Sequence, residues 1–252
     1  MSVIADDGAL AAALAEAGGR IALEVRAAGL LAGKALGDAG DKVVNAFLVR
    51  ALAAQRPDDG LLSEESRDTP ERLSKSRVWI VDPIDGTREY GEARPDWAIH
   101  VALAVDGRAT AGAVALPGLG LVLSSADPPP LPPPNHPPRL LVSRTRPAPE
   151  APALARAIGA ELLEMGSAGA KAMAVVRGEA DVYFHTGGQH EWDNCAPVAV
   201  AQAAGLHVSR ADGSLLVYNQ ADTLLPDLLI CRRELAEAVL AAIAEAPAPG
   251  GR

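Results

Sequence analysis

The most informative stretch of the chain is Trp79-Ile80-Val81-Asp82-Pro83-Ile84-Asp85-Gly86-Thr87. The apolar residues 77–81 predict a buried strand, and Asp82-Pro83 is expected to end or bend it, because proline has no N–H for the ladder. The turn fixed by Pro83 can direct both aspartates and the Ile84 carbonyl to one point. A hard divalent cation binds to such a cluster of oxygens.

The two residues after the second aspartate, Gly86 and Thr87, are expected to begin a helix. Their N–H groups and the positive end of the helix dipole would then face an anion beside the cation. A simpler interpretation is an Asp-Pro turn followed by an aspartate N-cap. This stretch alone does not decide between the two.

Two further carboxylates could reach the same edge of a sheet, one from the pair Glu64 and Glu65 and one from Asp193. Glu64 and Glu65 end the segment 61–65, which predicts a strand, and Asp193 precedes the apolar segment 196–204, which predicts a helix. A solvated loop would explain the glutamates, and a helix N-cap would explain Asp193. Uncompensated burial of four acids together would cost several kcal/mol per ion, so their convergence would require bound cations.

The composition excludes several classes of protein. The chain has 252 residues, 49% of them hydrophobic, and a formal net charge of −9. The acidic balance argues against nucleic-acid binding, although divalent cations can let an acidic protein bind phosphorylated substrates. No apolar run is long enough to span a membrane, so no membrane partner is expected. Two cysteines, Cys195 and Cys231, and an N-terminus without a leader pattern predict a cytoplasmic location.

The pattern along the chain predicts two domains. Residues 1–126 would form an N-terminal α+β metal-binding domain with a mostly antiparallel sheet and two helices, which the glycine-rich segment 33–41 would separate. Residues 127–138 would form a proline-rich connector. Residues 139–252 would form a C-terminal α/β substrate domain, because predicted strands and helices alternate. Its strands are expected at 140–143, 180–184 and 206–208, and its helices at 151–158, 168–177, 196–204 and 234–245.

The segment Asp85-Gly86-Thr87 is also similar to part of the Asp-x-Asp-Gly-Thr motif of haloacid-dehalogenase-type phosphatases, whose first aspartate is a covalent nucleophile. Position 83 of this chain is proline, so its carboxylates at 82 and 85 have the wrong spacing for that chemistry. A metal-activated water is the better nucleophile.

Four separated motifs together resemble the inositol monophosphatase superfamily of magnesium-dependent, lithium-sensitive phosphatases. They are Ser63-Glu64-Glu65, the stretch 79–87, Gly166-Ser167 and Glu191-Trp192-Asp193. The resemblance spans residues 30–205 and implies a layered αβαβα sugar-phosphatase fold. Thr87-Arg88-Glu89-Tyr90 is similar to the Thr-(Lys/Arg)-Glu-(Phe/Tyr) of the 3′(2′),5′-bisphosphate nucleotidase branch, which is CysQ-type in bacteria. Segments 166–171 and 185–189 resemble the actinobacterial form of that branch.

The resemblance implies a site for two or three Mg²⁺ ions. One ion would bind through Glu64, Asp82 and the Ile84 carbonyl, and another through Asp82, Asp85 and Asp193. Metals roughly 3.5–4 Å apart fit an in-line displacement in which one activates the attacking water and the other holds the leaving oxygen. Glu64 and Thr87, together with an acid upstream, are the expected catalytic residues.

The upstream acid is where this chain departs from the family pattern. The family commonly has Lys-x-Asp-x-Ser-Pro-Val-Thr-x-Ala-Asp, whereas residues 34–41 are shorter and lack Ser-Pro-Val-Thr. Asp38 is the first candidate for the partner of Thr87, and Asp41 is the second. Both could instead be loop or N-cap acids.

The same resemblance implies a substrate site in which the phosphate lies on backbone N–H groups after the second aspartate. Ser143-Arg144-Thr145-Arg146 resembles the family's Ser-Arg-Ser-His, so Arg144 could bind a second phosphate through a bidentate fork. Arg144 and Lys171 could instead be surface cations. The expected substrate-binding residues are Asp85, Gly86, Thr87, Arg144, Ser167, Lys171 and Asp193.

The predicted function is hydrolysis of the 3′-phosphate of 3′-phosphoadenosine 5′-phosphate in sulfate assimilation, with its 5′-phosphosulfate as a second candidate substrate. Inositol 1-monophosphatase or fructose 1,6-bisphosphatase activity is an alternative. A non-catalytic metal-binding homologue is an alternative of another class, against which the intact acidic residues argue. The sequence leaves open the ranking of substrates, the number of metals and whether the protein is a homodimer.

Overall fold

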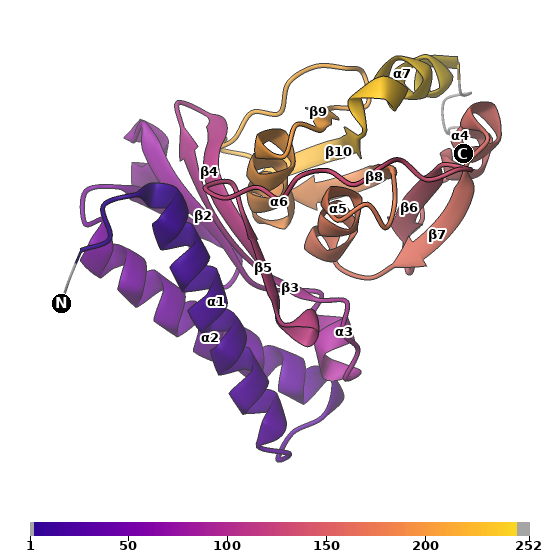
Figure 1. Ribbon diagram of the computed structural model, residues 1–252. Helices are drawn as coiled ribbons and strands as arrows, with labels where there is room; N and C mark the ends of the chain where they lie inside the picture. The colour runs from indigo at the N-terminus through magenta and orange to yellow at the C-terminus, as the bar shows by residue number, and fades with distance from the viewer. Residues whose placement is uncertain (1–2, 246–252) are drawn as a thin grey trace.

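The first sheet is formed by the first half of the chain (Figure 1). In their order across the sheet, its strands are β1 (Gly60–Ser63), β2 (Arg77–Asp85), β3 (Ala98–Val105), β4 (Arg108–Leu116) and β5 (Leu121–Ser124). β1 and β2 are parallel, and all other neighbours are antiparallel. Short 3₁₀ helices, η1 (Pro70–Ser74) and η2 (Pro117–Leu119), precede β2 and β5. The computed structural model describes residues 3–245.

Two long helices, α1 (Asp7–Ala27) and α2 (Gly33–Gln55), pack on the outer face of this sheet. The glycine-rich segment 33–41 was expected to separate them but is the beginning of α2. Close packing explains its glycines, because a Cβ on Gly40 would lie 2.8 Å from the Tyr90 ring and one on Gly37 would lie 3.2 Å from the Thr87 carbonyl oxygen. These glycines let α2 approach the short helix α3 (Thr87–Gly91).

The strand β2 does not end at Asp82-Pro83 but continues to Asp85. Asp82 pairs with His100 and Asp85 with Ala98, so β2 has one more residue than β3 between these pairs. Pro83 lies in this irregular part of the ladder, where the missing N–H is tolerated. Of the two expected alternatives, an end or a bend of the strand at Asp82-Pro83, the structure has an irregularity in the ladder and no end.

The second sheet is formed by the second half of the chain. In chain order, its strands are β6 (Arg139–Ser143), β7 (Glu161–Met165), β8 (Val182–His190), β9 (His207–Ser209) and β10 (Leu224–Cys231). Their order across the sheet is β7-β6-β8-β10-β9, in which β6 is parallel to both neighbours and β10 is antiparallel to both. The sequence did not predict β7, whose residues are largely exposed, or β10, which Pro226 and a register shift interrupt.

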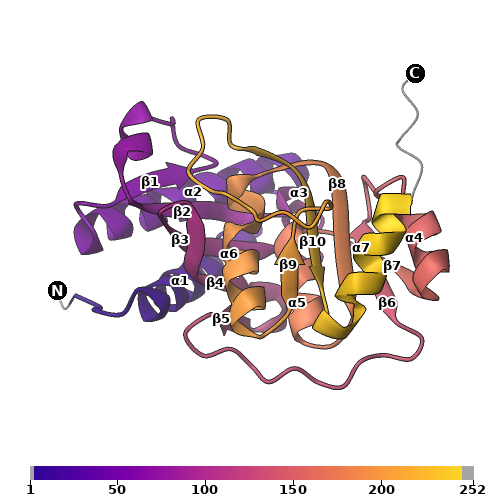
Figure 2. The ribbon, with the colours of Figure 1, turned by 90° about the horizontal axis from the view of Figure 1, so that it is seen from above.

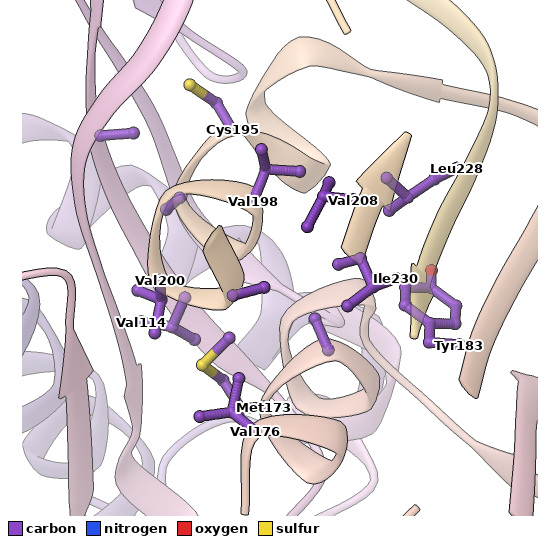
Figure 3. Packing of buried hydrophobic residues seen from close by; sticks show 14 of the residues in the cluster. Val114, Met173, Val176, Tyr183, Cys195, Val198, Val200, Val208, Leu228 and Ile230 are labelled. Atoms are coloured by element: carbon purple, nitrogen blue, oxygen red, sulfur yellow. The ribbon is translucent and has the colours of Figure 1, made fainter. Parts of the chain in front are cut away.

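A pair of helices, α5 (Ala168–Val176) and α6 (Glu191–Ala203), fills the space between the two sheets. Figure 3 shows Met173 and Val176 of α5 and Val200 of α6 together, with Val114 of β4 on one side and Ile230 of β10 on the other. The start of α6 lies five residues before the predicted one, so Asp193 is inside its first turn.

Two more helices, α4 (Ala151–Ile158) and α7 (Ala236–Glu245), cover the outer face of the second sheet, and the 3₁₀ helix η3 (Arg233–Leu235) precedes α7. Residues 3–245 therefore form layers in the order helix, sheet, helix, sheet, helix. This arrangement confirms the predicted αβαβα fold class.

The proline-rich connector runs in an extended form along one side of the molecule from β5 to β6 (Figure 2). Arg232 donates a hydrogen bond to the Pro132 carbonyl at 2.6 Å, and Asp181 accepts one from the Asn135 N–H at 3.0 Å. The division into two domains at residues 127–138 stays a prediction. Residues 1–2 and 246–252, at the ends of the two predicted domains, lie outside the described residues.

Candidate active site

Three aspartates from two elements meet at the end of β2. A carboxylate oxygen of each of Asp82, Asp85 and Asp193 lies within 4.8 Å of the other two. Asp193 reaches this point from the first turn of α6, where it also accepts a hydrogen bond from the His190 N–H at 2.7 Å. Glu64, directly after β1, and Ile84 line the same pocket as the aspartates.

The electrostatics of this cluster favour a bound cation. Burial and the nearby charges of Glu64, Asp85 and Asp193 raise the pKa of Asp82 well above its ordinary value. Burial and the charge of Asp85 also raise the pKa of Asp193 to about 7. Asp82 Oδ1 is buried and has no hydrogen-bond partner among the described residues. A divalent cation would compensate the repulsion and occupy the unpartnered oxygen.

The orientation of Asp85 is fixed by donors at the start of α5. Its Oδ2 accepts hydrogen bonds from the Ser167 hydroxyl and from the Gly169 N–H, the latter at 2.6 Å. Ser167 Oγ in turn accepts one from the Ala170 N–H at 2.9 Å and caps the helix. Ser167, predicted as a substrate-binding residue, therefore contacts Asp85.

The turn from β2 into α3 depends on Gly86. Its φ of +90° lies in the left-handed region, and a Cβ there would come within 3.2 Å of the Ser167 Cβ. Glycine avoids both the backbone strain and the contact. Gly86 and Thr87 therefore follow Asp85 in a tight turn and line the pocket.

The two candidate upstream acids both lie on α2, in different environments. The Asp38 carboxylate is exposed and accepts hydrogen bonds from Lys34 Nζ at 2.7 Å. Asp41 is only 6% exposed, and its Oδ1 has no partner among the described residues. Burial and the charge of Glu64 raise the pKa of Asp41 to about 8, although the Ile84 N–H hydrogen bond opposes this shift. Asp41 thus lies next to the acidic cluster.

The pocket beside the carboxylates has a volume of about 340 Å³. Several of its residues received no role from the sequence, although most of them belong to motifs that the family resemblance had pointed out. They are Arg88, Glu89, Ser143, Thr145, Arg146, Gly166, Ala168, Tyr183, His185 and Gln189. Tyr183 lies outside those motifs, within an apolar strand, and its sequence context gave no signal.

The two arginines of the segment 143–146 lie in different environments, which the sequence did not distinguish. Arg144 is not among the described residues that line the pocket, and its Nη2 donates hydrogen bonds to Glu89 at 2.6 Å and Glu92 at 3.2 Å. Arg146 lines the pocket, is exposed and forms no ion pair within residues 3–245. The pocket therefore carries an unpaired guanidinium at its rim.

Lys171 is a buried cation and not a surface one. Only 3% of the residue is exposed, and its Nζ donates to the carbonyl oxygens of Gly166 and Ser167. The ammonium also lies 5.2 Å from the centre of the Tyr183 ring. Burial lowers the pKa of Lys171 to about 8 even though Asp85 and other acids oppose the shift. A buried positive charge in this pocket suits an anionic ligand.

Residues 9–128 and 139–248 match the model of the inositol monophosphatase family. This chain belongs to the inositol monophosphatase family. It is 47% identical to the 3′-phosphoadenosine 5′-phosphate phosphatase of Mycobacterium leprae (strain TN), over 95% of this chain and 94% of that protein. It is 28% identical to the 3′(2′),5′-bisphosphate nucleotidase CysQ of Escherichia coli (strain K12), over 74% of this chain and 81% of that protein. The predicted resemblance to this branch of the family is confirmed.

The fold is shared with a solved structure of the same family. The inositol monophosphatase from Anabaena (Nostoc) sp. PCC 7120 has a TM-score of 0.76 to this chain, with 21% identity over 95% of this chain and 96% of that one. Family members are metal-dependent phosphatases, and the cluster of Asp82, Asp85 and Asp193 fits a divalent metal by its oxygen ligands and its unpartnered buried atom. Among residues 3–245, no helix is both long and apolar enough to cross a membrane.

Proposed function

We propose that this chain is a Mg²⁺-dependent phosphatase that hydrolyses the 3′-phosphate of 3′-phosphoadenosine 5′-phosphate in sulfate assimilation. The observation that carries the proposal is its 47% identity, over almost its whole length, to a phosphatase named for that substrate. The intact acidic cluster and a pocket of about 340 Å³, within the usual size of small-molecule sites, support it. The 5′-phosphosulfate of the same nucleotide is a second candidate substrate.

In this proposal the carboxylates of Glu64, Asp82, Asp85 and Asp193, with the Ile84 carbonyl, would hold two or three Mg²⁺ ions. When bound, the ions lower the pKa of the attacking water and neutralise charge on the phosphate oxygens. The surrounding residues hold the ligands in position, as the Ser167 hydroxyl does when it donates a hydrogen bond to Asp85. The N–H groups after Asp85 would bind the phosphate, since they lie in a tight turn that lines the pocket.

Thr87 would orient the water together with an acid of α2. We place Asp41 in this role and not Asp38, because Asp41 is buried beside the acidic cluster and Asp38 is exposed and paired with Lys34.

Replacing each acid separately tests this assignment. Asp41→Asn is expected to lower kcat about 100-fold, because general acid–base groups typically contribute that much or more. Asp38→Asn is the matched control on the same helix, and its kcat should stay within about twofold of wild type because its carboxylate is exposed. The reverse ranking of the two variants would assign the role to Asp38.

The second phosphate of the substrate would bind to Arg146, because Arg144 is engaged by Glu89 and Glu92. Arg146→Met is expected to raise the KM for 3′-phosphoadenosine 5′-phosphate at least about 10-fold, since a charge-assisted hydrogen bond contributes about 1.5–3 kcal/mol. The KM for 3′-AMP, which lacks the second phosphate, should hardly change. An equal rise in KM for both substrates would show that Arg146 does not bind the second phosphate.

The proposed function is tested by phosphate release from 3′-phosphoadenosine 5′-phosphate, inositol 1-phosphate and fructose 1,6-bisphosphate, each with Mg²⁺, with EDTA and with Mg²⁺ plus Li⁺. We expect the highest kcat/KM for the nucleotide, no activity in EDTA and inhibition by Li⁺. A preference for inositol or sugar phosphate would overturn the substrate. Failure to hydrolyse all three would leave a non-catalytic metal-binding homologue.

We also propose a cytoplasmic location. Cys195 and Cys231 are buried free thiols in the structure, a state that a reducing compartment maintains. A homodimer stays a prediction, which sedimentation of the purified protein would test.

A further inference from the structure

A polar network built around the buried side chains of Arg72 and Glu191 joins two segments of the chain that carry proposed metal ligands. The first is the segment 64–76, which begins with Glu64 and contains η1. The second is the start of α6, which carries Asp193. In this network the segment 64–76 and the start of α6 do not contact each other directly. Both bind the turn at Asn219 and Gln220.

Arg72 connects the first segment to this turn. Its side chain is almost completely buried, and it makes a bidentate ion pair with Asp68 at 2.7 and 2.8 Å. The same guanidinium donates to Asn219 Oδ1 at 2.8 Å and to the Gln220 carbonyl oxygen at 3.0 Å. A fork of this kind fixes both distance and orientation.

Glu191 connects the turn to α6. It is fully buried, and its two carboxylate oxygens accept hydrogen bonds from the N–H groups of Asn219 and Gln220, each at 2.7 Å. Glu191 begins α6 two residues before Asp193. Any displacement of the turn would therefore be transmitted to the first turn of this helix.

Asn219 is the centre of the network. It has a φ of +59°, and its Nδ2 donates to the carbonyl oxygens of Arg72 at 3.1 Å and Lys75 at 3.3 Å. Asparagine tolerates the left-handed region better than most residues and also provides both an amide donor and an acceptor. Its side chain binds the first segment while its N–H binds Glu191.

We propose that Arg72, Asn219 and Glu191 form a clamp that positions Glu64 relative to Asp193 and thereby raises the affinity of the site for Mg²⁺. The inference rests on the metal site of the proposed function. Glu64 lies on a loop after the four-residue strand β1, whereas Asp193 lies on a helix of the central layer. Glu64 would bind one of the proposed ions and Asp193 the other, with Asp82 shared between them, so the distance between the two elements determines whether both ions fit. Residues that orient metal ligands typically contribute about 10–100-fold to metal affinity.

The clamp is tested by the affinity for Mg²⁺, measured by calorimetric titration of the metal-free protein at a temperature where circular dichroism shows each variant folded. Arg72→Met and Asn219→Gly are expected to raise the dissociation constant about 10-fold. Asn219→Gly removes the side chain but keeps a residue that accepts the positive φ. Arg108→Met is the matched control, because Arg108 binds the Leu216 carbonyl of the same loop without reaching the segment 64–76.

The result that would overturn the clamp is an unchanged Mg²⁺ affinity in Asn219→Gly, and this variant decides the question if Arg72→Met does not fold. A loss of affinity of equal size in Arg108→Met would also overturn it, because the effect would then come from the loop in general. Absence of phosphatase activity in a wild type that binds Mg²⁺ would refute the proposed function, while the affinities would still decide the clamp.

Discussion

Asp82→Asn is expected to lower kcat at least about 100-fold while raising the melting temperature of the metal-free protein. The loss of activity follows because the amide weakens a ligand that stabilises charge in the transition state. The gain in stability follows because Asp82 is buried among Glu64, Asp85 and Asp193, and its raised pKa shows that the folded protein disfavours its charge. A neutral side chain of the same shape removes that repulsion.

The variant is expected to lose activity but gain stability. A carboxylate with a structural role would instead lose stability when replaced, so the two measurements together distinguish a functional role from a structural one. The measurements are kcat at saturating Mg²⁺ and thermal unfolding in EDTA. Asp58→Asn, a change of the same kind at an exposed position, should alter neither value. If Asp82→Asn unfolded at a lower temperature than wild type in EDTA, Asp82 would have a structural role and the interpretation of its burial would be wrong.

The acidic cluster could be predicted from the sequence because its geometry is mostly local. Asp82 and Asp85 lie in one strand and its turn, and a buried strand followed by Asp-Pro-x-Asp-Gly leaves few places for the two carboxylates. Asp193 and Glu64 were included in the predicted metal site because one site accounts for all four acids, whereas helix caps and loops would need a separate explanation for each. The family resemblance supplied the order of the motifs, and the match to the family model over residues 9–128 and 139–248 confirms the family.

The surroundings of the cluster could not be predicted, because they depend on contacts between distant segments. Lys171 is buried through the packing of α5 between two sheets, and Arg144 is held by Glu89, which is 55 residues away in sequence. The segment 33–41 contains three glycines, which normally indicate a break, but two of them serve the close approach of α2 to α3. Local patterns do not contain such information.

Removal of Mg²⁺ is expected to abolish activity and to make the stability of the protein fall as the pH rises. Burial and neighbouring acids raise the pKa of Asp193 to about 7 and that of Asp41 to about 8, from an ordinary value of 3.8. The folded protein therefore binds these protons more tightly than the unfolded chain does. The stabilisation that results is fully present below the ordinary value and is lost as the pH rises through the folded-state values.

Mg²⁺ should reverse this trend, because its ligands bind it in their deprotonated form and it binds the folded protein alone. Thermal unfolding between about pH 5 and about pH 8, with EDTA and with Mg²⁺, measures both effects. The paired acids Asp7, Asp68 and Asp96 have lowered pKa values, so they titrate below this window. Burial lowers the pKa of His100, His185 and His207 from 6.5, which opposes the trend in the lower part of the window, so the effect of the acids is measured above about pH 6.5.

The difference in melting temperature between the Mg²⁺ and EDTA samples should grow steadily toward pH 8, and it should shrink in the variant that combines Asp41→Asn with Asp193→Asn. That variant lacks the two groups whose charge the folded protein disfavours, so its EDTA profile should be flatter than that of wild type. A wild-type protein that became more stable toward pH 8 in EDTA would contradict the argument, because the buried carboxylates would then already be compensated by the protein itself.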